Sequence, residues 1–526
     1  MIDKASAKNS PGPELFIGLV GAVGTELDRV IHILQQALNN VNYGSEVIRL
    51  ASLLRAIPRY SGLPTKNIDE YTDSHMTAGD EFRKITERSD AVAILGIGDI
   101  ITKRVESGRR YGEIKSNWTY IIRSLKNPAE VTTLRQTYGD SFYLIAAYSP
   151  YQKRKAHLAK RIARSRNEYP YDRHFPVADC LMLRDREEAE MSHGQNTQDV
   201  FHRADVFLDM TDISELKKEV DRFIELIFGN SFHTPTKPEY AMFHAQAAAL
   251  RSAELGRQVG AAIATENGDI VSVGTNEVPK AGGGLYWCTD MPDRREFRLG
   301  SDSNDEHKRE LISETLQLLR AAGWLDSKRA KLELEDLVSQ ALDQKKPVLR
   351  KDSKIRNLIE YGRAVHAEMA SLTDAALRGV SVAGCTMYVT TFPCHLCARH
   401  IVAAGIKRVI YIEPYAKSLA AELYPDSIIV DGGEPDGLQV PFEPFMGISP
   451  RQYMNLFYMS KRKDPASGDV FEFSPSNAKL RFYELPRVYL ENEDLKVKNL
   501  GNKIKRSRIL RKKLEWIPIC GQKTGS

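Results

Sequence analysis

The sequence predicts an α/β protein in which an N-terminal parallel-sheet domain precedes a C-terminal three-layer α/β/α domain. Buried apolar runs alternate with amphipathic helical patterns along most of the chain, which is typical of a wound parallel sheet. A polar stretch with two prolines at 229–240 interrupts this alternation and marks a domain boundary. The length of 526 residues allows two to four domains at roughly 100–200 residues each.

Composition excludes several classes of protein. Hydrophobic residues make up 42% and charged residues 27% of the chain, as in an ordinary globular protein. The net charge of +5, from 74 basic and 69 acidic residues, does not by itself indicate a nucleic-acid polymer as partner. No apolar run approaches the roughly 18 residues that span a bilayer, and residues 1–14 lack the apolar core of a signal peptide. We therefore expect a cytoplasmic protein without a membrane segment.

The N-terminal half begins with a loose leader, residues 1–13. Residues 14–24 then read as a buried strand that runs into a glycine-containing turn, and 25–40 follow as an amphipathic helix with Thr25 as its N-cap. Further buried strands are expected at 91–97, 141–148 and 205–210.

The C-terminal half resumes with a helix at 241–259. A hairpin is expected from 259–264 and 270–276, because Asn267-Gly268 is a strong turn signal. Residues 281–360 break the rhythm, and we interpret them as an insertion that lies over one face of the second domain. Beyond it we expect a helix from 363, a strand at 386–391, a helix at 394–405, a strand at 408–413, a helix at 417–423 and a strand at 427–432.

The residues that carry chemistry are His366-Ala-Glu368 and Pro393-Cys394-His-Leu-Cys397. Zinc prefers nitrogen and sulfur ligands in a tetrahedron, and a catalytic site keeps one of the four positions open. His366, Cys394 and Cys397 supply three ligands. Pro393 suits the start of a helix, where positive potential favours thiolates. The pattern therefore predicts a catalytic Zn²⁺ site.

Glu368 follows His366 by two residues and can face the same cavity without binding the metal. Zinc lowers the pKa of water toward neutrality. Glu368 is then placed to take the proton of that water and to pass it on, first to the cytosine ring of a substrate and then to the amino group that leaves it. H-x-E…P-C-x-x-C is the known signature of the zinc deaminases.

Two other interpretations of these residues stay open. A structural zinc site needs four protein ligands, and His395 or His400 could supply the fourth, which would leave Glu368 without a catalytic role. A C-x-x-C pair can also be a redox pair, although that chemistry does not need the upstream H-x-E.

At these residues the chain resembles the cytidine and deoxycytidylate deaminase superfamily, over about 241–281 and 363–432. The resemblance implies that Asn276, in GTNEVP, binds the sugar of the substrate. Glu277 and Arg257 are weaker candidates for sugar or phosphate contacts. Two further weak candidates near the sugar or phosphate are Tyr411 and Tyr415. The alternative role for Asn276 is that of a turn residue after a strand.

The whole layout resembles the bacterial anti-phage deoxycytidine nucleotide deaminases, which join a P-loop kinase-like domain to the zinc domain. The resemblance implies conversion of free dCTP, and of dCMP, to the uracil nucleotide, with depletion of dCTP in antiviral defence. It divides the chain into a kinase-like domain at 1–235, a deaminase domain at 236–465 with the insertion 281–360, and a basic extension at 466–526. We also expect a homo-oligomer.

Gly18, Gly21 and Gly24 follow a strand and open a helix, the right context for a phosphate-binding loop. A P-loop needs G-x-x-x-x-G-K-[ST], whereas Gly24 is followed by Thr25 and Glu26. We expect the kinase scaffold without phosphoryl transfer, with 153–166 as its arginine-rich lid and 194–210 as a late helix and strand. Nucleotide sensing, a structural role or partner binding stays open, and the three glycines could equally serve tight packing.

Three alternatives remain for function and partners. The zinc domain could edit single-stranded DNA or RNA, as relatives with the same zinc core do, although its segments show no basic, aromatic channel. The chain could be a signalling NTPase, which the missing lysine disfavours. The basic stretches 153–166 and 501–514 could bind a regulatory RNA, although they lack interleaved aromatic residues.

Overall fold

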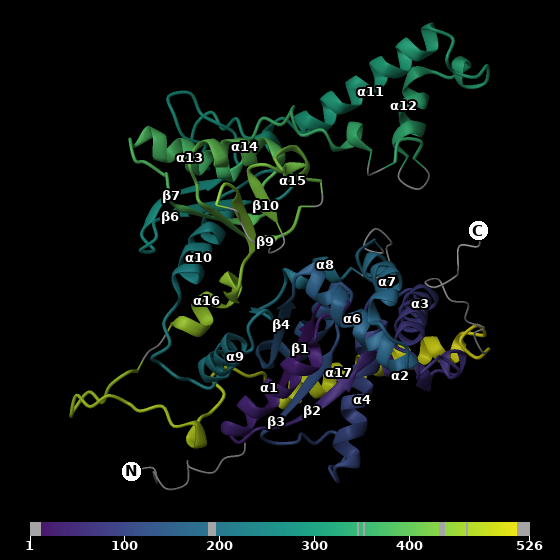
Figure 1. Ribbon diagram of the computed structural model, residues 1–526, viewed down its shortest axis with the longest axis vertical. Helices are drawn as coiled ribbons and strands as arrows, with labels where there is room; N and C mark the ends of the chain where they lie inside the picture. The colour runs from purple at the N-terminus through teal and green to yellow at the C-terminus, as the bar shows by residue number, and fades with distance from the viewer. Residues whose placement is uncertain are drawn as a thin grey trace. The chain divides into compact units, whose positions relative to one another are not determined.

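The computed structural model in Figure 1 describes residues 12–187, 196–343, 347–350, 353–415, 417–430, 437–458 and 461–512. The leader 1–13, the segments 194–210 and 427–432 and the basic stretch 501–514 therefore lie partly outside the described residues. The chain divides into two compact units, the first formed by Met1–Glu239 with Met446–Ser526 and the second by Tyr240–Phe445.

The first unit is built on a six-stranded sheet in the order β12-β5-β4-β1-β3-β2. All its neighbouring strands are parallel except β12, which pairs antiparallel with β5. The parallel pairing confirms the predicted wound sheet. The strands are β1 (Glu14–Val20), β2 (Gly44–Arg49), β3 (Trp118–Arg123), β4 (Phe142–Tyr148), β5 (Val206–Asp209) and β12 (Gly447–Ile448).

Helices cover both faces of this sheet. Alternate residues of β1 point to opposite faces: Leu15 and Ile17 join the apolar core with α1 and α9, whereas Phe16 stacks on Tyr138 of α5 with ring centroids 3.6 Å apart. The helices of the first unit are α1 (Leu27–Asn40), α2 (Leu50–Leu53), α3 (Ile68–Thr86), α4 (Ala91–Glu106), α5 (Pro128–Tyr138), α6 (Tyr151–Arg166), α7 (Phe175–Glu187), α8 (Thr197–Phe201), α9 (Ile213–Ile227), α16 (Pro450–Phe457) and α17 (Pro486–Arg506).

The C-terminal segment is part of this first unit rather than a separate basic extension. Helix α17 packs against α4, and the buried guanidinium of Arg104 on α4 pairs with Glu14 of β1 at 2.8 Å and with Glu493 of α17 at 2.6 Å. Tyr489 of α17 also donates a hydrogen bond to Glu14 at 3.0 Å. Breaking a buried ion pair of this kind is costly, so α17 is an integral element of the unit.

The second unit contains a mixed six-stranded sheet in the order β10-β11-β9-β8-β6-β7. The hairpin β6–β7 and the pair β6–β8 are antiparallel, and β8, β9, β11 and β10 are parallel to one another. The strands are β6 (Gly260–Ala264), β7 (Ile270–Thr275), β8 (Thr386–Thr391), β9 (Arg408–Glu413), β10 (Ile428–Val430) and β11 (Val440–Pro444). Its helices are α10 (Lys237–Ala249), α11 (Ser303–Ala321), α12 (Leu334–Leu342), α13 (Ala367–Leu377), α14 (His395–Ala403) and α15 (Ala420–Leu423).

Two glycines let helices approach this sheet closely from its two faces. A Cβ on Gly260 of β6 would lie 1.9 Å from the carbonyl oxygen of Ala245 on α10, and a Cβ on Gly274 of β7 would lie 2.2 Å from that of Ala367 on α13. Gly274 pairs with Ala261, the neighbour of Gly260, so the two glycines point to opposite faces. Figure 1 accordingly shows α10 on the opposite side of the sheet from α13 and α14, which is the predicted three-layer arrangement.

Three of the predicted elements were wrong in type or extent. Residues 91–97 form the start of helix α4, not a strand, because a short apolar run does not by itself distinguish a buried helix from a buried strand. Helix α10 ends at Ala249 instead of 259, where Ser252 accepts a bond from the backbone of Glu254 and competes with the helical pattern. Thr25 is not the N-cap of α1, since that position belongs to Glu26 and has no side-chain cap.

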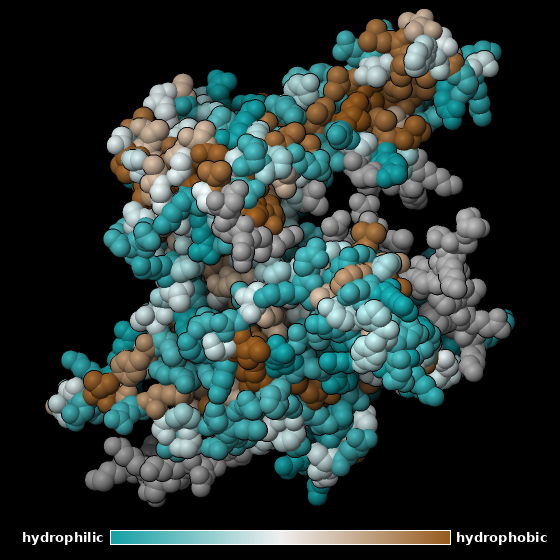
Figure 2. Space-filling view, in the orientation of Figure 1, coloured by the Kyte–Doolittle hydropathy of each residue, from teal (hydrophilic) through white to brown (hydrophobic). Residues whose placement is uncertain are grey.

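The insertion does not lie over a face of the sheet as expected. Its helices α11 and α12 pack on each other and extend away from the sheet of the second unit (Figure 1). Figure 2 shows hydrophobic side chains gathered over this hairpin. Leu318 and Trp324 of the insertion are 63% and 81% exposed. The physical reason is that the hairpin closes its own small core. In the described part of the chain, no helix combines the length and apolarity that crossing a membrane requires.

Candidate active site

His366 is held at the start of α13 by the close contact between that helix and the sheet. It occupies the N-cap position with extended backbone angles, and its carbonyl oxygen accepts the first helical bond, from Ala370, at 2.8 Å. Just before it, Val365 forms a two-way backbone bridge with Glu277, with N···O distances of 3.0 and 3.3 Å. The imidazole is therefore fixed from both the helix and the strand side.

The two cysteines lie at the start of α14, after β8. Cys394 is the N-cap residue, and its sulfur accepts a bond from the backbone nitrogen of Cys397 at 3.5 Å. Two residues before Cys394, the backbone nitrogen of Phe392 donates to the carbonyl oxygen of Glu413 on β9 at 2.7 Å. Both sulfurs are buried and belong to the core between the sheet and its helices.

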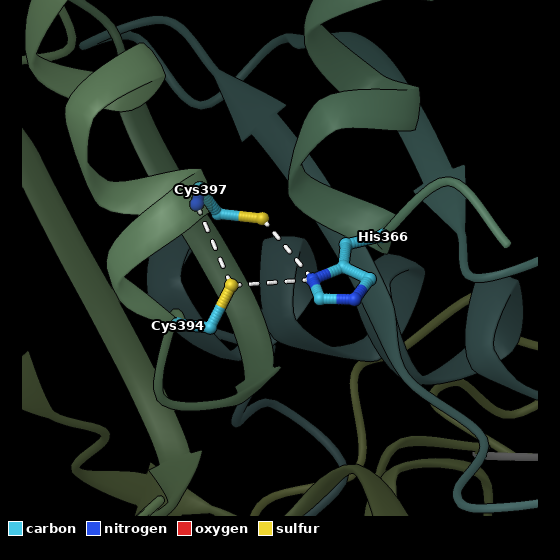
Figure 3. A group of neighbouring side chains, drawn as sticks. All are labelled: His366, Cys394 and Cys397. Atoms are coloured by element: carbon cyan, nitrogen blue, oxygen red, sulfur yellow. Dashed lines mark hydrogen bonds between the residues drawn. The ribbon is translucent and has the colours of Figure 1, made fainter. Parts of the chain in front are cut away.

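The three side chains converge on one point (Figure 3). The Nδ1 atom of His366 lies 3.3 Å from the sulfur of Cys394 and 3.4 Å from that of Cys397. All three ligand atoms lie within 4.8 Å of one another. Zinc bonds of about 2.1 Å to nitrogen and 2.3 Å to sulfur at tetrahedral angles would separate these atoms by about 3.5 Å. The donor set and its spacing therefore fit zinc.

The three donors share protons with one another. The pKa of Cys394 is lowered to about 4, because the Cys397 thiol and then His366 donate to its sulfur. The hydrogen bond to Cys394 and then burial raise the pKa of Cys397. The hydrogen bond to Cys394 also raises the pKa of His366, to about 9. A metal ion replaces these protons when thiolates and a neutral imidazole bind it.

Glu368 is buried beside the three donors, with 4% of its surface exposed. Burial raises the pKa of its carboxyl group to about 7, and the positive charge of His366 opposes this rise. Its position two residues into α13 brings the carboxylate next to Cys397, with which it interacts. A carboxyl group in this environment can exchange a proton near neutral pH.

Neither histidine that could have closed the site as a fourth ligand joins the group in the described part of the chain. The metal-binding cluster found there contains only His366, Cys394 and Cys397. His395 points its Nε2 atom toward Glu360, 3.9 Å from the carboxylate oxygen, and His400 is exposed in the last turn of α14. The structural four-ligand interpretation thus gains no support.

Asn276 is buried at the end of β7, where it organises the loop before β6. Its Oδ1 atom accepts a bond from the nitrogen of Val259, and its Nδ2 atom donates to the carbonyl oxygen of Arg257, both at 2.7 Å. The neighbouring Glu277 accepts bonds from the nitrogens of Ala253 and Val278 at 3.0 and 2.9 Å. These bonds are structural. The second hydrogen of Nδ2 and the second lone pair of Oδ1 in Asn276 can still form hydrogen bonds.

The other weak candidates divide into core and rim residues. Tyr411 lies in the core, where its ring packs edge-on against Phe392 at 4.9 Å between centroids. Arg257 is half exposed and pairs with Glu413 at 2.6 Å, and its guanidinium lies 6.0 Å from the ring of Tyr415. Tyr415 lies close enough to the Cys394 thiolate for that charge to raise its pKa, after burial as the main cause.

Two residues near the site were missed by the sequence analysis. The Oε2 atom of Glu254 is buried without a hydrogen-bond partner among the described residues, and its charge contributes to the raised pKa of His366. The hydroxyl of Ser418 donates to the carbonyl oxygen of Pro393 at 2.8 Å and fixes the loop that carries the cysteines. Neither residue belongs to the motif, so only the fold brings them to the site.

The three glycines of the first unit occupy different environments. Gly18 lies inside β1, where an added Cβ would lie 2.8 Å from Leu125 and 2.9 Å from Phe142, so it serves packing there. Gly21 and Gly24 line a cavity at the end of β1. Gly24 has a φ of +92°, and an added Cβ would lie 2.6 Å from the carbonyl oxygen of Arg154, so glycine is required there.

Comparison with known proteins places the zinc signature in a family. Residues 235–413 match the model of the family described as the cytidine and deoxycytidylate deaminase zinc-binding region. This stretch contains the three converging side chains. Together with their geometry, the match identifies Zn²⁺ as the metal of this site.

Individual relatives match parts of the chain. It is 46% identical to the deoxycytidylate deaminase of Enterobacteria phage T4 over 54 residues, which are 10% of this chain and 28% of that protein. It is 28% identical to the human deoxycytidylate deaminase over 177 residues, 33% of this chain and 64% of that protein. The chain thus spans less than two thirds of the length of either relative.

A solved structure matches as well. The crystal structure of the dCMP deaminase from cyanophage S-TIM5 in complex with dCMP and dUMP shows 18% identity, covers 40% of this chain and all of that chain, and has a TM-score of 0.22. That score is too low to establish a common overall fold.

Proposed function

We propose that the second unit is a zinc-dependent hydrolytic deaminase that converts free deoxycytidine nucleotides, dCTP and also dCMP, to deoxyuridine nucleotides. The observation that carries the proposal is the convergence of His366, Cys394 and Cys397 beside the buried carboxyl group of Glu368. Three protein donors and a neighbouring proton carrier are the parts that hydrolytic removal of an amino group from a base requires.

The residues divide the chemistry between them. His366, Cys394 and Cys397 would hold the zinc, which when bound lowers the pKa of water and so supplies a nucleophile at neutral pH. Glu368 takes a proton from the attacking water and delivers it to N3 of the cytosine ring, and then carries a second proton to the amino group at C4. The C4–N bond breaks, ammonia leaves and a uracil carbonyl remains, so water and cytosine are converted to ammonia and uracil.

Deoxycytidine nucleotides are favoured as substrates by the names of the relatives. The phage T4 and human proteins are deoxycytidylate deaminases, and the S-TIM5 enzyme was crystallised with dCMP and dUMP. In this chain, Asn276 would use its remaining bonding capacity on a sugar hydroxyl. Among the candidate residues, Arg257 carries a positive charge, and it would bind the phosphates.

We further propose that the first unit is a kinase-like scaffold and that the enzyme depletes dCTP in anti-phage defence. The strand order β2-β3-β1-β4-β5, all parallel, with a glycine loop between β1 and α1, supports the scaffold. The resemblance of the layout supports the role in defence. The exposed apolar side chains Leu318 and Trp324 on the insertion support a homo-oligomer.

The direct test is to incubate the purified full-length protein separately with dCTP, dCMP and a cytosine-containing single-stranded DNA, and to measure uracil product and ammonia. We expect turnover of the free nucleotides, its loss after dialysis against a chelator and its return on addition of zinc. Product from the single-stranded DNA alone would instead establish a polynucleotide editor. Product from none of the three would contradict deamination of deoxycytidine substrates.

A further inference from the structure

The first unit contains a cavity that the deaminase chemistry does not use. It has a volume of about 390 Å³ and is lined by the β1–α1 loop, the end of β2, α3 and α6. Small-molecule sites typically fall in the range of about 300–1,000 Å³. Aliphatic side chains such as Leu50, Leu54 and Ile68 share the lining with charged ones, so the cavity can accommodate a ligand with an apolar and an anionic part.

The glycine loop at one end of this cavity is already occupied by a carboxylate of the protein. Asp185 of α7 accepts a bond from the backbone nitrogen of Val23 at 2.8 Å, and bonds from Lys126 and Thr197 at 2.8 and 3.1 Å. Its side chain is 4% exposed. A phosphate bound in the loop would need the same backbone donor, so Asp185 excludes it. The cavity therefore lacks the place that holds the transferred phosphate in a P-loop enzyme.

Positive charge gathers beside the loop around Asp28. Asp28 of α1 pairs with Arg49, at 3.1 Å, and with Arg123. Arg161 of α6 lines the same cavity and forms no hydrogen bond or ion pair among the described residues. Its pKa is lowered by burial and then by Arg123, with Arg49 adding to the effect and Asp28 opposing it. Glu26, which pairs with Arg29, opposes the lowering as well. Three guanidinium groups thus lie near two carboxylates, one of which is paired with a further arginine, so a net positive site for an anion remains.

Two buried polar atoms in the cavity wall have no partner among the described residues. They are the Oγ1 atom of Thr25 and the Nε2 atom of His75, and each side chain belongs to a residue that is 5% exposed. The Nδ1 atom of His75 donates a hydrogen bond to the carbonyl oxygen of Tyr71 at 2.8 Å, so Nε2 of the neutral ring is an acceptor. Its ring stacks on that of Tyr71, with centroids 3.9 Å apart. Buried polar atoms of this kind require a bonding partner.

We propose that this cavity binds a nucleoside monophosphate without transferring its phosphoryl group. Arg49, Arg123 and Arg161 would hold the phosphate. The Thr25 hydroxyl and the His75 acceptor would bond the sugar or base, which would lie against the aliphatic and aromatic lining. The proposal is independent of the deaminase function, because none of these residues belongs to the second unit.

The test is isothermal titration calorimetry on the full-length zinc-loaded protein with dAMP, dGMP and dTMP, none of which has the 4-amino pyrimidine that the second unit would deaminate. We expect saturable binding of at least one of them, and affinity reduced at least about tenfold by Arg161→Gln, since bonds to charged groups are strong. Arg164→Gln, an exposed position on the same helix α6, is the matched control and should bind as the unchanged protein does. Thr25→Val provides a second variant that removes one hydroxyl and no charge.

Each outcome decides the proposal. Binding that weakens in Arg161→Gln and Thr25→Val, but not in Arg164→Gln, supports it. Absence of saturable binding at about 1 mM nucleotide, equal affinity in Arg161→Gln, or inorganic phosphate that binds as tightly as the nucleotides would overturn it. Consumption of ATP with a bound monophosphate as acceptor would overturn the absence of phosphoryl transfer.

Discussion

Both units of the molecule contain a loop that leads from a buried strand into the N-terminus of a helix, but the two loops accommodate different anions. Between β1 and α1, the nitrogen of Val23 donates to the carboxylate of Asp185, which is neutralised by Lys126. Between β8 and α14, the nitrogen of Cys397 donates to the sulfur of Cys394, which faces an imidazole. Cys394 caps α14, where the helix N-terminus favours an anion, whereas Val23 precedes the start of α1 at Leu27.

The difference lies in what neutralises the anion. In the first loop the counter-ion is a lysine of the same unit, so the site is complete and serves structure. In the second loop two sulfurs and His366 form a donor set that fits a cation from outside the chain, and Glu368 stands beside them. A backbone nitrogen that binds an anion is therefore part of a structural site in one unit and of the proposed zinc site in the other.

The largest effect is expected from Cys394→Ser, which removes one of the two sulfurs. We expect loss of bound zinc and at least about a thousandfold loss of deamination, because a structural or catalytic zinc site depends on each ligand. Zinc per protein and uracil release are the measurements. Cys288→Ser, at an exposed free cysteine, is the control and should leave both unchanged. Stoichiometric zinc in Cys394→Ser would rule out its role as a ligand.

The next largest effect is expected from Asp185→Ala in the first loop. It leaves Lys126 and the Val23 nitrogen without their partner, and breaking a buried pair costs about 3–5 kcal/mol. Urea denaturation measures this loss in the free energy of unfolding of the first unit. Asp179→Ala removes a half-exposed carboxylate that pairs with Lys155 on the surface, and should cost under about 1 kcal/mol. Equal losses in the two variants would show that the Asp185 carboxylate is not central to the loop.

A smaller effect is expected from Gly274→Ala. The added Cβ would lie 2.2 Å from the carbonyl oxygen of Ala367, so α13 must move and carry His366 with it. Overpacking of this kind costs about 1–3 kcal/mol, and zinc affinity should fall with stability. Gly256→Ala, where an added Cβ meets nothing within 4 Å, is the control. Unchanged zinc affinity in Gly274→Ala would show that this contact does not position His366.

The smallest effect concerns pH and His75. Burial lowers the pKa of His75 below its ordinary value of 6.5, and Arg55 contributes to the shift. The folded state therefore binds this proton less readily than the unfolded state, so the stability contribution is present above pH 6.5 and is lost as the pH falls below it. His75→Gln should unfold at denaturant midpoints that depend less on pH between 7.5 and 5.5. Parallel pH profiles for the two proteins would contradict the assignment.

The sequence allowed the zinc site to be predicted because its parts are local. His366 and Glu368 are two residues apart, the cysteines three, and each pair begins a helix, so short-range pattern and cap geometry are sufficient. The sheet class and the β6–β7 hairpin followed from alternation and from Asn267-Gly268 for the same reason. Glu254 and Ser418 could not be found, since only tertiary packing brings them near His366 and Pro393.

The remaining features depend on long-range contacts that a pattern does not encode. Asp185 meets Val23 across 162 positions of sequence, and Glu493 meets Arg104 across 389. A short apolar run such as 91–97 is compatible with both a buried helix and a buried strand. The segments that pack around it therefore decide which of the two forms. The insertion helices pack against each other around Ile312, Leu337 and Val338, a contact that the sequence alone did not distinguish from packing against the sheet.

We propose that Glu368 moves protons at a zinc site that it does not help to hold. The most direct measurement is zinc content together with uracil release in Glu368→Gln, which keeps the size of the side chain and removes its ability to exchange a proton. We predict full zinc content with deamination slowed by about 10²–10⁴. Turnover at the rate of the unchanged protein, or loss of the metal in this variant, would contradict the assignment.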